Sequence, residues 1–389
     1  MQGFITYILI FCFISPCLCT RLNVETTNDN YNVMQYGAIG DGKSDDTQAF
    51  SKAWSSVCAS SGMATLVIPS GKSFLVTKVN FSGPCNAKIR IQMEGRIVAP
   101  SKENWKGGNN LISIEYLNEL IVDGNGLGEI NGNGATWWNC PTCVRPGVLF
   151  FHACNGLNVR NLKITNSPQI HVYVMECNGA TFTHVSINSP ATSPNTDGFG
   201  ISYASNILIQ DSDIKSGDDC IAINTGSTFI NATRVNCGPG HGISVGSLGR
   251  NRATDKVSDV HVRNCTFTET MNGARIKTVE GGSGYAKQIT FEQITLVNVQ
   301  NPIIIDQKYN PGIQDTSVSV SSVTYRGFTG TSATDVAIKL DCSSSGCNDI
   351  QLADNNIVSA QPGKKTSAFC SNAHGTATNT IPNVLCLNQ

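Results

Sequence analysis

The segment Asn206-Ile-Leu-Ile-Gln-Asp-Ser-Asp-Ile214 decides the fold, because the same phrase of alternating apolar and polar residues returns along the middle of the chain. One earlier copy is Leu157-Asn-Val-Arg-Asn-Leu-Lys-Ile164, and one later copy is Val260-His-Val-Arg-Asn-Cys-Thr-Phe267. The closing apolar residues of successive phrases are 21 to 32 positions apart. Alternation with period two indicates strands, and a repeat of this length with several strands per repeat indicates a solenoid.

A second short apolar run follows each phrase, for example Ile221–Ile223 and Ile243–Val245. These segments lack the i, i+3, i+4, i+7 spacing of helical repeats. A β-sandwich also has evenly spaced strands, but its turns do not return the same phrase. The repeat therefore predicts an all-β fold, a right-handed parallel β-helix whose successive coils are about 4.8 Å apart.

One segment has helical spacing instead. Apolar residues at positions 49, 50, 53, 54 and 57 follow Asp45 and Asp46, which predicts an amphipathic helix over Asp45–Val57 with an acidic N-cap. We expect this helix to cover the open N-terminal end of the solenoid. Asp41, Asp45 and Asp46 resemble a carboxylate cluster, but turn and cap roles are favoured over catalysis for them.

The composition agrees with a scaffold of small residues and few charges. The 389 residues include 37 glycines, and charged residues make up 14% of the chain, against about 25% in ordinary soluble domains. The formal net charge of −1 gives no support for binding nucleic acid or an anionic membrane surface. The 40% of apolar residues argues against a disordered chain.

The N-terminal residues 1–19 resemble a secretory signal peptide, with an apolar stretch over Ile8–Ile14 followed by small residues. The alternative, a membrane anchor, is disfavoured because the stretch is too short to span a bilayer. Residues 20–389 show no internal boundary and are expected to form one secreted, soluble domain. Asn80, Asn231 and Asn264 begin glycosylation sequons, which fits secretion.

The chain has 16 cysteines, and removing the three in residues 1–19 leaves an odd number, so at least one thiol is expected to stay unpaired. Cys342 with Cys347, and Cys370 with Cys386, are expected to form local disulfides near the C-terminus.

Two further cysteine pairs carry alternatives. Cys220 and Cys237 are 17 positions apart, one coil, and within reach of a disulfide, whereas a reactive Cys220 nucleophile lacks a clear activating partner. Cys140-Pro-Thr-Cys143 could be a metal or redox motif. The absence of a second such pair in the sequence and an oxidising compartment argue against that interpretation.

The unusual polar residues fall at matching points of successive coils. Asp197, Asp219 and His241 are each 22 positions apart, and each precedes a short apolar run. Because residues one repeat apart stack in a solenoid, these side chains and the adjacent Asp218 should share one wall. Arg275 and Lys277, two apart in a strand, should face the same side, and Tyr309 follows the next short run.

Three close carboxylates cannot all ionise without cost, so at least one pKa should be raised. Glycoside hydrolysis needs two carboxyl groups in different protonation states, a protonated acid and an ionised base. The coil spacing allows two distances between the two carboxyl groups. A distance of about 5 Å would give retention of the anomeric configuration, and one of about 6.5–9.5 Å would give inversion. Arg275 and Lys277 nearby suggest an anionic sugar.

Structural interpretations compete with this one. Aspartates in turns often only make Asx turns, and an isolated His241 would more often be structural. The carboxylates could also bind Ca²⁺, although the two neighbouring cations and the histidine make that less favourable.

Four ordered motifs resemble the polygalacturonases (pectinases) of glycoside hydrolase family 28, and their plant branch most of all. The resemblance extends from about Tyr31 to Cys386. The motifs are Asn195-Thr-Asp-Gly, Gly217-Asp-Asp-Cys, Gly238-Pro-Gly-His-Gly-Ile-Ser-Val-Gly-Ser and Arg275-Ile-Lys-Thr.

The resemblance implies a pectin-lyase-like β-helix and inverting hydrolysis of α-1,4-galacturonosyl linkages in pectin, as part of plant cell wall modification. It assigns Asp218 as general acid, Asp197 with Asp219 as the holders of the attacking water, and His241 as the residue that assists the protonation of the acid.

The resemblance also assigns the substrate contacts. Arg275 and Lys277 would bind galacturonate carboxylates, and Asn195 and Tyr309 would belong to the same binding set. The implied partner is polygalacturonate, the implied location is the extracellular cell wall, and the implied state is a monomer. No metal and no organic cofactor are implied.

Two departures from the family pattern stand out. Phe199-Gly-Ile replaces the Ile-His-Ile of many relatives, which should alter the cleft wall, and Asn310 follows Tyr309 where many plant members have cysteine. A pectate or pectin lyase and a non-catalytic wall-binding β-helix stay open as alternatives. The motifs do not distinguish endo from exo attack.

Overall fold

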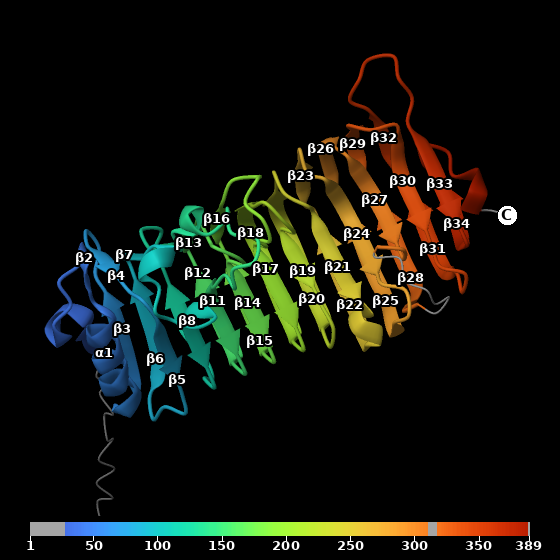
Figure 1. Cartoon of the computed structure of the whole chain (residues 1–389). Coiled ribbons are helices and arrows are strands. Elements are labelled where there is room, and N and C mark those ends of the chain that lie inside the picture. Colours follow the sequence, from blue (N-terminus) through green and yellow to red (C-terminus); the bar gives the residue numbers. More distant parts are fainter. Residues whose placement is uncertain (1–27, 310–316, 388–389) are drawn as a thin grey trace, which may run out of the picture.

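The computed structural model describes residues 28–309 and 317–387, so the predicted signal peptide and Asn310 lie outside the described residues. The described chain is a parallel β-helix, as the repeat predicts. Its coils stack into a long rod with the single α-helix at the N-terminal end and the C-terminus at the other (Figure 1). All strand pairings are parallel, in an 11-stranded sheet and a 23-stranded sheet.

The 11-stranded sheet takes one strand from each coil and carries the polar motifs. Its strands, in spatial order, are β5 (Val79–Ser82), β8 (Asn110–Glu115), β11 (Gly147–His152), β14 (Val172–Met175), β17 (Phe199–Ser202), β19 (Ile221–Ile223), β21 (Ile243–Leu248), β24 (Asn272–Thr278), β27 (Asn301–Asp306), β30 (Val336–Asp341) and β33 (Ser367–Ser371).

The 23-stranded sheet forms the remaining walls of the rod. Its strands are β1 (Asn28–Asn32), β2 (Asp41–Asp45), β3 (Met63–Ile68), β4 (Ser73–Leu75), β6 (Lys88–Met93), β7 (Arg96–Val98), β9 (Ile121–Asp123), β10 (Glu129–Asn131), β12 (Asn155–Arg160), β13 (Lys163–Thr165), β15 (Asn178–Thr183), β16 (Ser186–Asn188), β18 (Ser205–Lys215), β20 (Thr228–Cys237), β22 (Thr254–Arg263), β23 (Thr266–Thr268), β25 (Ser283–Glu292), β26 (Thr295–Val299), β28 (Ser319–Arg326), β29 (Thr329–Ser332), β31 (Cys347–Ala353), β32 (Asn356–Ser359) and β34 (Ala373–Thr378).

The repeated phrase contains a bend in its backbone. In the copy over residues 157–164, Asn161 has φ 55° and joins β12 to β13, whereas the copy over residues 206–214 stays within β18, with φ 49° at Asp211. Asparagine tolerates this left-handed conformation better than most residues. The apolar residues of the phrase point into the rod, where Leu157, Val159 and Ile164 are buried.

The register of the 11-stranded sheet confirms the predicted stacking. Phe199 pairs with Ile221, and Ile221 pairs with Ile243. Each step is the 22-residue coil read from the sequence. Polar residues that precede these strands are therefore brought to neighbouring coils on one side of the rod.

The N-terminal end is covered by α1 (Thr47–Ala59), which buries the predicted apolar face of Ala49, Phe50, Ala53, Trp54 and Val57. The Trp54 ring packs on Phe81 of β5 with a centroid distance of 4.8 Å. Burying these side chains removes the exposed end of the hydrophobic core from water.

The predicted acidic N-cap is corrected in its details. The helix begins at Thr47, and Asp46 occupies the cap position without capping the helix through its side chain. Its carboxylate instead accepts hydrogen bonds from the backbone N–H of Ile39 and Gly40. Asp45 accepts from the Thr47 N–H, and Asp41 accepts from the N–H groups of Lys43 and Ser44, so these aspartates have the predicted structural roles.

The predicted disulfides Cys220–Cys237, Cys342–Cys347 and Cys370–Cys386 are present. Cys58–Cys85 and Cys140–Cys143 are also bonded, so the sulfurs of the Cys-Pro-Thr-Cys segment are in a disulfide and not free to bind a metal ion. Within the described chain the unpaired thiols are buried and number three, Cys154, Cys177 and Cys265. The described chain has no helix that is long and apolar enough to cross a membrane.

In the described residues, four short 3₁₀ helices lie in loops between strands, and a fifth follows the last strand, β34. They are η1 (Val33–Tyr36), η2 (Lys102–Asn104), η3 (Gly134–Thr136), η4 (Arg250–Arg252) and η5 (Leu385–Leu387).

Candidate active site

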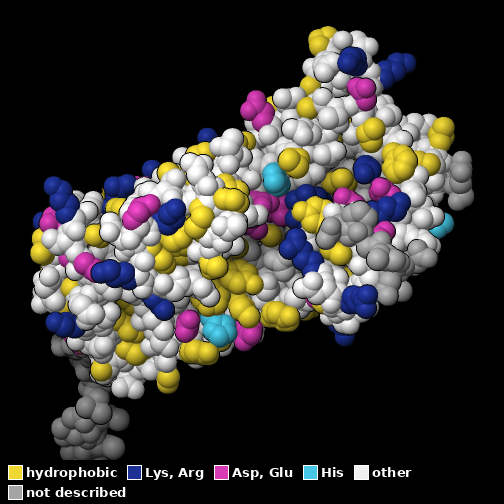
Figure 2. All heavy atoms as spheres, viewed as in Figure 1, with side chains coloured by type: hydrophobic (Ala, Val, Ile, Leu, Met, Phe, Trp, Pro, Cys, Tyr) yellow, Lys and Arg dark blue, Asp and Glu magenta, His cyan; other side chains and the backbone are white. Residues whose placement is uncertain are grey.

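A cleft runs over the outer face of the 11-stranded sheet near the middle of the rod. It has a volume of about 870 Å³ and extends from Asn109, before β8, to Tyr309, after β27. Figure 2 shows acidic side chains in the hollow, a histidine beside them and basic side chains on the C-terminal side. Asp197, Asp218, Asp219 and Lys277 line this cleft, as the motif spacing predicts.

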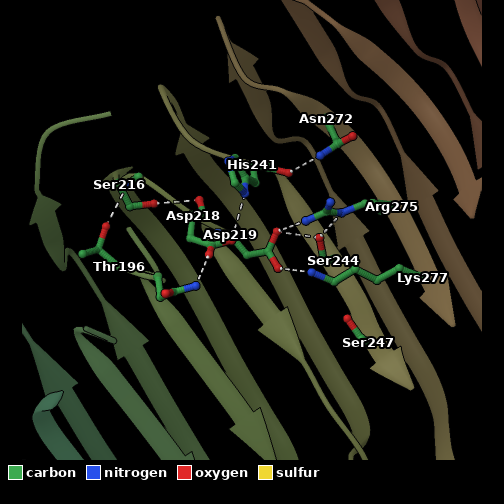
Figure 3. A network of polar contacts seen from close by, with 12 residues as sticks. Thr196, Ser216, Asp218, Asp219, His241, Ser244, Ser247, Asn272, Arg275 and Lys277 are labelled. Carbon is green, nitrogen blue, oxygen red and sulfur yellow. Dashed lines mark hydrogen bonds and ion pairs between the residues drawn. The ribbon is translucent and has the colours of Figure 1, made fainter. Parts of the chain in front are cut away.

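The Asp218 carboxylate is held between two neighbours. Its Oδ1 lies 2.9 Å from Nδ1 of His241, one coil away, and its Oδ2 accepts a hydrogen bond from Nδ2 of Asn195 at 3.3 Å. The loop before β19 is fixed by Ser216, whose hydroxyl donates to the Asp218 backbone oxygen (Figure 3). Asp218 is thus oriented within the cleft.

Asp219 is the anion of a buried ion pair with two cations. Its Oδ2 accepts from Nζ of Lys277 at 2.8 Å, and its Oδ1 accepts from Nη2 of Arg275 at 2.5 Å. Ser244 links the group, because its hydroxyl donates to Asp219 and accepts from Nε of Arg275 (Figure 3). The side chains of Arg275 and Lys277 are each only 7% exposed.

The carboxylates differ in proton affinity, as the sequence predicts, but the raised pKa belongs to Asp197. Burial, followed by the charges of Asp218 and Asp219, raises the pKa of Asp197 well above its usual value. Burial also tends to raise the pKa of Asp218, but the hydrogen bond and charge of His241, together with Lys277, outweigh burial and lower it. The carboxyl with the raised pKa is therefore Asp197, whereas the pKa of the predicted acid, Asp218, is lowered.

The Asp197 turn is held by a histidine that sequence reasoning missed. His171 is fully buried, and its backbone N–H and its Nδ1 lie 2.9 and 2.8 Å from the backbone oxygen of Asp197. Its Nε2 lies 2.8 Å from the hydroxyl of Ser189. Burial lowers the pKa of His171 to about 4, so it is a neutral structural partner. Only its position one coil before Asp197 could have indicated this contact.

Arg145 is a second residue that sequence reasoning missed. It lines the cleft, and its Nη2 donates to Oδ1 of Asn195 at 2.6 Å. Asn195 has φ 55° and in turn contacts Asp218. Arg145 lies 50 residues before Asn195 in the sequence and outside the four motifs, so no local signal points to this contact.

Tyr309 follows β27 and lies over the cationic side of the cleft. Nζ of Lys277 is 5.2 Å from its ring centroid, and Cζ of Arg275 is 6.0 Å away. Lys277 and Tyr309 line the cleft, whereas Arg275 and His241 are not among its lining residues. The structure thus brings all eight predicted site residues together, but Arg275 reaches the cleft through Asp219 and Ser244.

The group Asp218, Asp219 and His241 could in principle hold a metal ion, because their ligand atoms lie within 4.8 Å of one another. The donor set does not fit a cation well. Both oxygens of Asp219 already accept from Arg275 and Lys277, whose charges oppose a second cation there. The arrangement suits acid–base chemistry better than metal binding.

Comparison with known proteins identifies the family. The model of "Glycosyl hydrolases family 28" matches residues 58–380. A probable polygalacturonase of Arabidopsis thaliana is 44% identical over 94% of this chain and 82% of its own length. Polygalacturonase-2 of Solanum lycopersicum is 40% identical over 93% of this chain and 83% of its own.

The fold is shared with solved structures of low identity. An endo-xylogalacturonan hydrolase from Aspergillus tubingensis matches with a TM-score of 0.79 and 24% identity, over 90% of this chain and 100% of that one. A polygalacturonase from Erwinia carotovora matches with a TM-score of 0.68 and 21% identity, over 91% of this chain and 96% of that one. From the family match and the plant relatives together, the chain belongs to glycosyl hydrolase family 28.

Proposed function

We propose that this enzyme is a secreted polygalacturonase that hydrolyses α-1,4-galacturonosyl linkages of pectin with inversion. The observation that carries the proposal is the placement of Asp218 in the cleft, between His241 and Asn195 and beside Asp197. Two carboxyl groups of different proton affinity facing one cleft are what glycoside hydrolysis requires.

In this proposal Asp218 donates a proton to the leaving glycosidic oxygen. His241 supplies that proton across the 2.9 Å hydrogen bond, because a histidine–aspartate ion pair can pass its proton to the carboxylate when substrate displaces water. The lowered pKa of Asp218 in the free enzyme then describes the ion-paired state before substrate binds.

Asp197 and Asp219 hold the attacking water. Asp197 is the base in its ionised form, and its raised pKa limits that form to higher pH. Asp219 is fixed by Arg275 and Lys277, so its role is to orient the water through the remaining lone pair of Oδ2.

Lys277 is the cation of this group that faces the substrate. It lines the cleft, and the ammonium group has two donors beyond the one that Asp219 accepts. We infer that Lys277, next to Tyr309, binds a galacturonate carboxylate. Arg275 supports the same contact by holding Asp219 and Ser244 in place.

Product analysis on de-esterified pectin tests the function. We expect new reducing ends without an ultraviolet-absorbing unsaturated product, and loss of release in Asp218→Asn. An unsaturated product would indicate a lyase, and saturable binding without any product would indicate a wall-binding protein. The sizes of early products would distinguish endo attack, which gives mixed oligomers, from exo attack, which gives monomer. Secretion and the monomeric state are proposed from the N-terminal sequence and the family resemblance.

A further inference from the structure

Arg145 has a half-buried guanidinium group that is anchored only by neutral acceptors. Nη1 donates to the backbone oxygens of Pro194 at 2.6 Å and Pro168 at 3.4 Å. Nη2 donates to Oδ1 of Asn195 at 2.6 Å. These bonds fix the plane of the guanidinium at the edge of the cleft, next to the residue that contacts Asp218.

Two donors of Arg145 are left for a ligand. A guanidinium has five N–H groups, and three are used by Pro168, Pro194 and Asn195. The remaining ones are Nε–H and one N–H of Nη2, and the atoms Nε and Nη2 form one edge of the guanidinium plane. This edge is the fork that binds a carboxylate through two parallel hydrogen bonds.

The charge of Arg145 has no counter-ion among the residues that the structure describes. The ion pairs found there involve other arginines, such as Arg90, Arg160 and Arg275. Burial lowers the pKa of Arg145, which means that the protein surroundings disfavour its charge. A partly buried cation normally has an anionic partner, so the missing partner is expected to come with the ligand.

An aromatic floor lies on the same N-terminal side of the cleft. The rings of Phe150 and Tyr173, which pair across β11 and β14, are stacked with a centroid distance of 5.6 Å. Both residues line the cleft. Sugar rings pack their apolar C–H faces on such surfaces, so the floor favours a sugar over a small free anion.

Gly200 makes room for this floor. A Cβ at position 200 would come within 2.4 Å of Cδ1 of Ile170 and 3.0 Å of Cδ2 of Tyr173. Ile170 and Tyr173 therefore occupy the space above β17 in which the histidine of the Ile-His-Ile pattern would lie. The glycine at position 200, where many relatives have histidine, is therefore what allows the aromatic floor to form.

We propose that Arg145 binds the carboxylate of the galacturonate unit that lies on one side of the scissile bond, the side toward the N-terminal coils of the protein. Phe150 and Tyr173 support the ring of that unit. The inference rests on the proposed polygalacturonase function and adds a second carboxylate contact opposite Lys277. It makes the enzyme select for a free acid, and against a methyl ester, on both sides of the bond that it cleaves.

The test compares two ligands on binding-competent but inactive protein. In an Asp218→Asn background, calorimetry measures the affinity for a galacturonate oligomer and for its fully methyl-esterified form, with Arg145 and with Arg145→Gln. We expect Arg145→Gln to weaken binding of the acid oligomer about tenfold or more, as for a charge-assisted hydrogen-bonded pair, and to change binding of the ester little. Arg263→Gln on β22, which removes the same charge from the other sheet, should change neither.

Equal loss for both ligands would overturn the proposal, because it would mean that Arg145 only positions Asn195 and the cleft loop. Unchanged affinity for both would also overturn it. If Arg145→Gln does not fold, Arg145→Lys decides the question: it keeps the charge and should keep a preference for the acid oligomer, reduced by the loss of the fork. Absence of hydrolysis by the wild-type enzyme would refute the proposed function. The binding measurements would still show whether Arg145 binds the carboxylate, because they do not depend on turnover.

Discussion

Nδ1 of His241 lies 2.9 Å from Oδ1 of Asp218, so a histidine and a carboxylate from neighbouring coils form one hydrogen-bonded pair. His241 also accepts a hydrogen bond at its backbone oxygen from Nδ2 of Asn272. The imidazole is thus anchored behind the carboxylate and is not among the residues that line the cleft. This geometry supports the proposed role of His241 as a positioning and proton-supplying residue.

Replacing His241 by alanine is expected to lower kcat on polygalacturonate about 100-fold, within the range for loss of general-acid assistance. KM should change little, because the imidazole does not line the cleft. Steady-state kinetics on polygalacturonate measures both values. A rise in KM with kcat unchanged would contradict the proton role.

Asp197→Asn is expected to abolish most activity while stabilising the fold. The folded pKa of Asp197 is raised above its ordinary value of 3.8, so the native state binds the proton more tightly than the unfolded chain. The ionised group therefore costs stability progressively as pH rises from about 4 through the raised pKa. In thermal unfolding, the Tm of the Asp197→Asn variant should be higher than that of the wild type near neutral pH. The difference in Tm should disappear at acidic pH.

A gap in Tm that is constant with pH would show that Asp197 is not held in an unfavourable charged state. The activity profile gives a second check. If Asp197 is the base, wild-type activity should rise with pH as Asp197 loses its proton.

Arg275→Met is expected to destabilise the protein by about 3–5 kcal/mol, the cost of removing one partner of a buried ion pair. Asp219 would keep Lys277 but lose its second cation within a nearly inaccessible site. Denaturant unfolding measures the loss. Arg263→Met is a matched control, because its pairing with Glu292 is exposed, and it should cost less than about 1 kcal/mol. Equal costs would contradict the structural role of the Asp219 pair.

Gly200→Ala is expected to raise KM for short galacturonate oligomers several-fold with a smaller change in kcat. The new methyl group displaces Ile170 and the Tyr173 ring from the cleft floor. Such overpacking should also cost about 1–3 kcal/mol of stability. Tyr173→Phe keeps the ring and loses only the hydrogen bond to Ser202, so it should keep the wild-type KM. An unchanged KM in Gly200→Ala would mean that the floor does not contact substrate.

The sequence was sufficient to predict what depends on periodicity. The stacking of Asp197, Asp219 and His241 follows from a constant coil length of 22 residues, because a parallel register converts equal spacing into adjacency. The apolar face of α1 was likewise readable from its spacing. In both cases one local pattern determines the placement of the side chains.

Contacts that depend on loops between coils were not readable. Arg145 reaches Asn195 over a separation of 50 residues, and nothing in the spacing of the motifs encodes that approach. The cap position gives a second case: Asp46 precedes the helix as predicted, but its carboxylate binds the folded-back segment at Ile39 and Gly40. Competing backbone donors decide such cases, and they are known only once the chain is folded.

The sequence also could not predict which of the aspartate carboxyl groups has the higher pKa. Crowding alone leads to the expectation that the pKa of one carboxyl group is raised. Which of the three carboxyl groups has the raised pKa depends on its burial and on the partner of each of its oxygens. Asp218 has His241 beside it, whereas Asp197 faces two other carboxylates. Residue identities place the three aspartates together without assigning these neighbours.

The central claim, hydrolysis with inversion at an Asp218–Asp197 pair, is tested most directly by proton NMR of the first products from polygalacturonate. An α-linked substrate cleaved with inversion gives β-anomers at the new reducing ends, which convert to the equilibrium mixture only later. We predict that the β-anomer signal appears first in wild type and that Asp218→Asn gives no such signal over the same time. Initial α-anomers, or an unsaturated residue at the new non-reducing ends, would contradict the account.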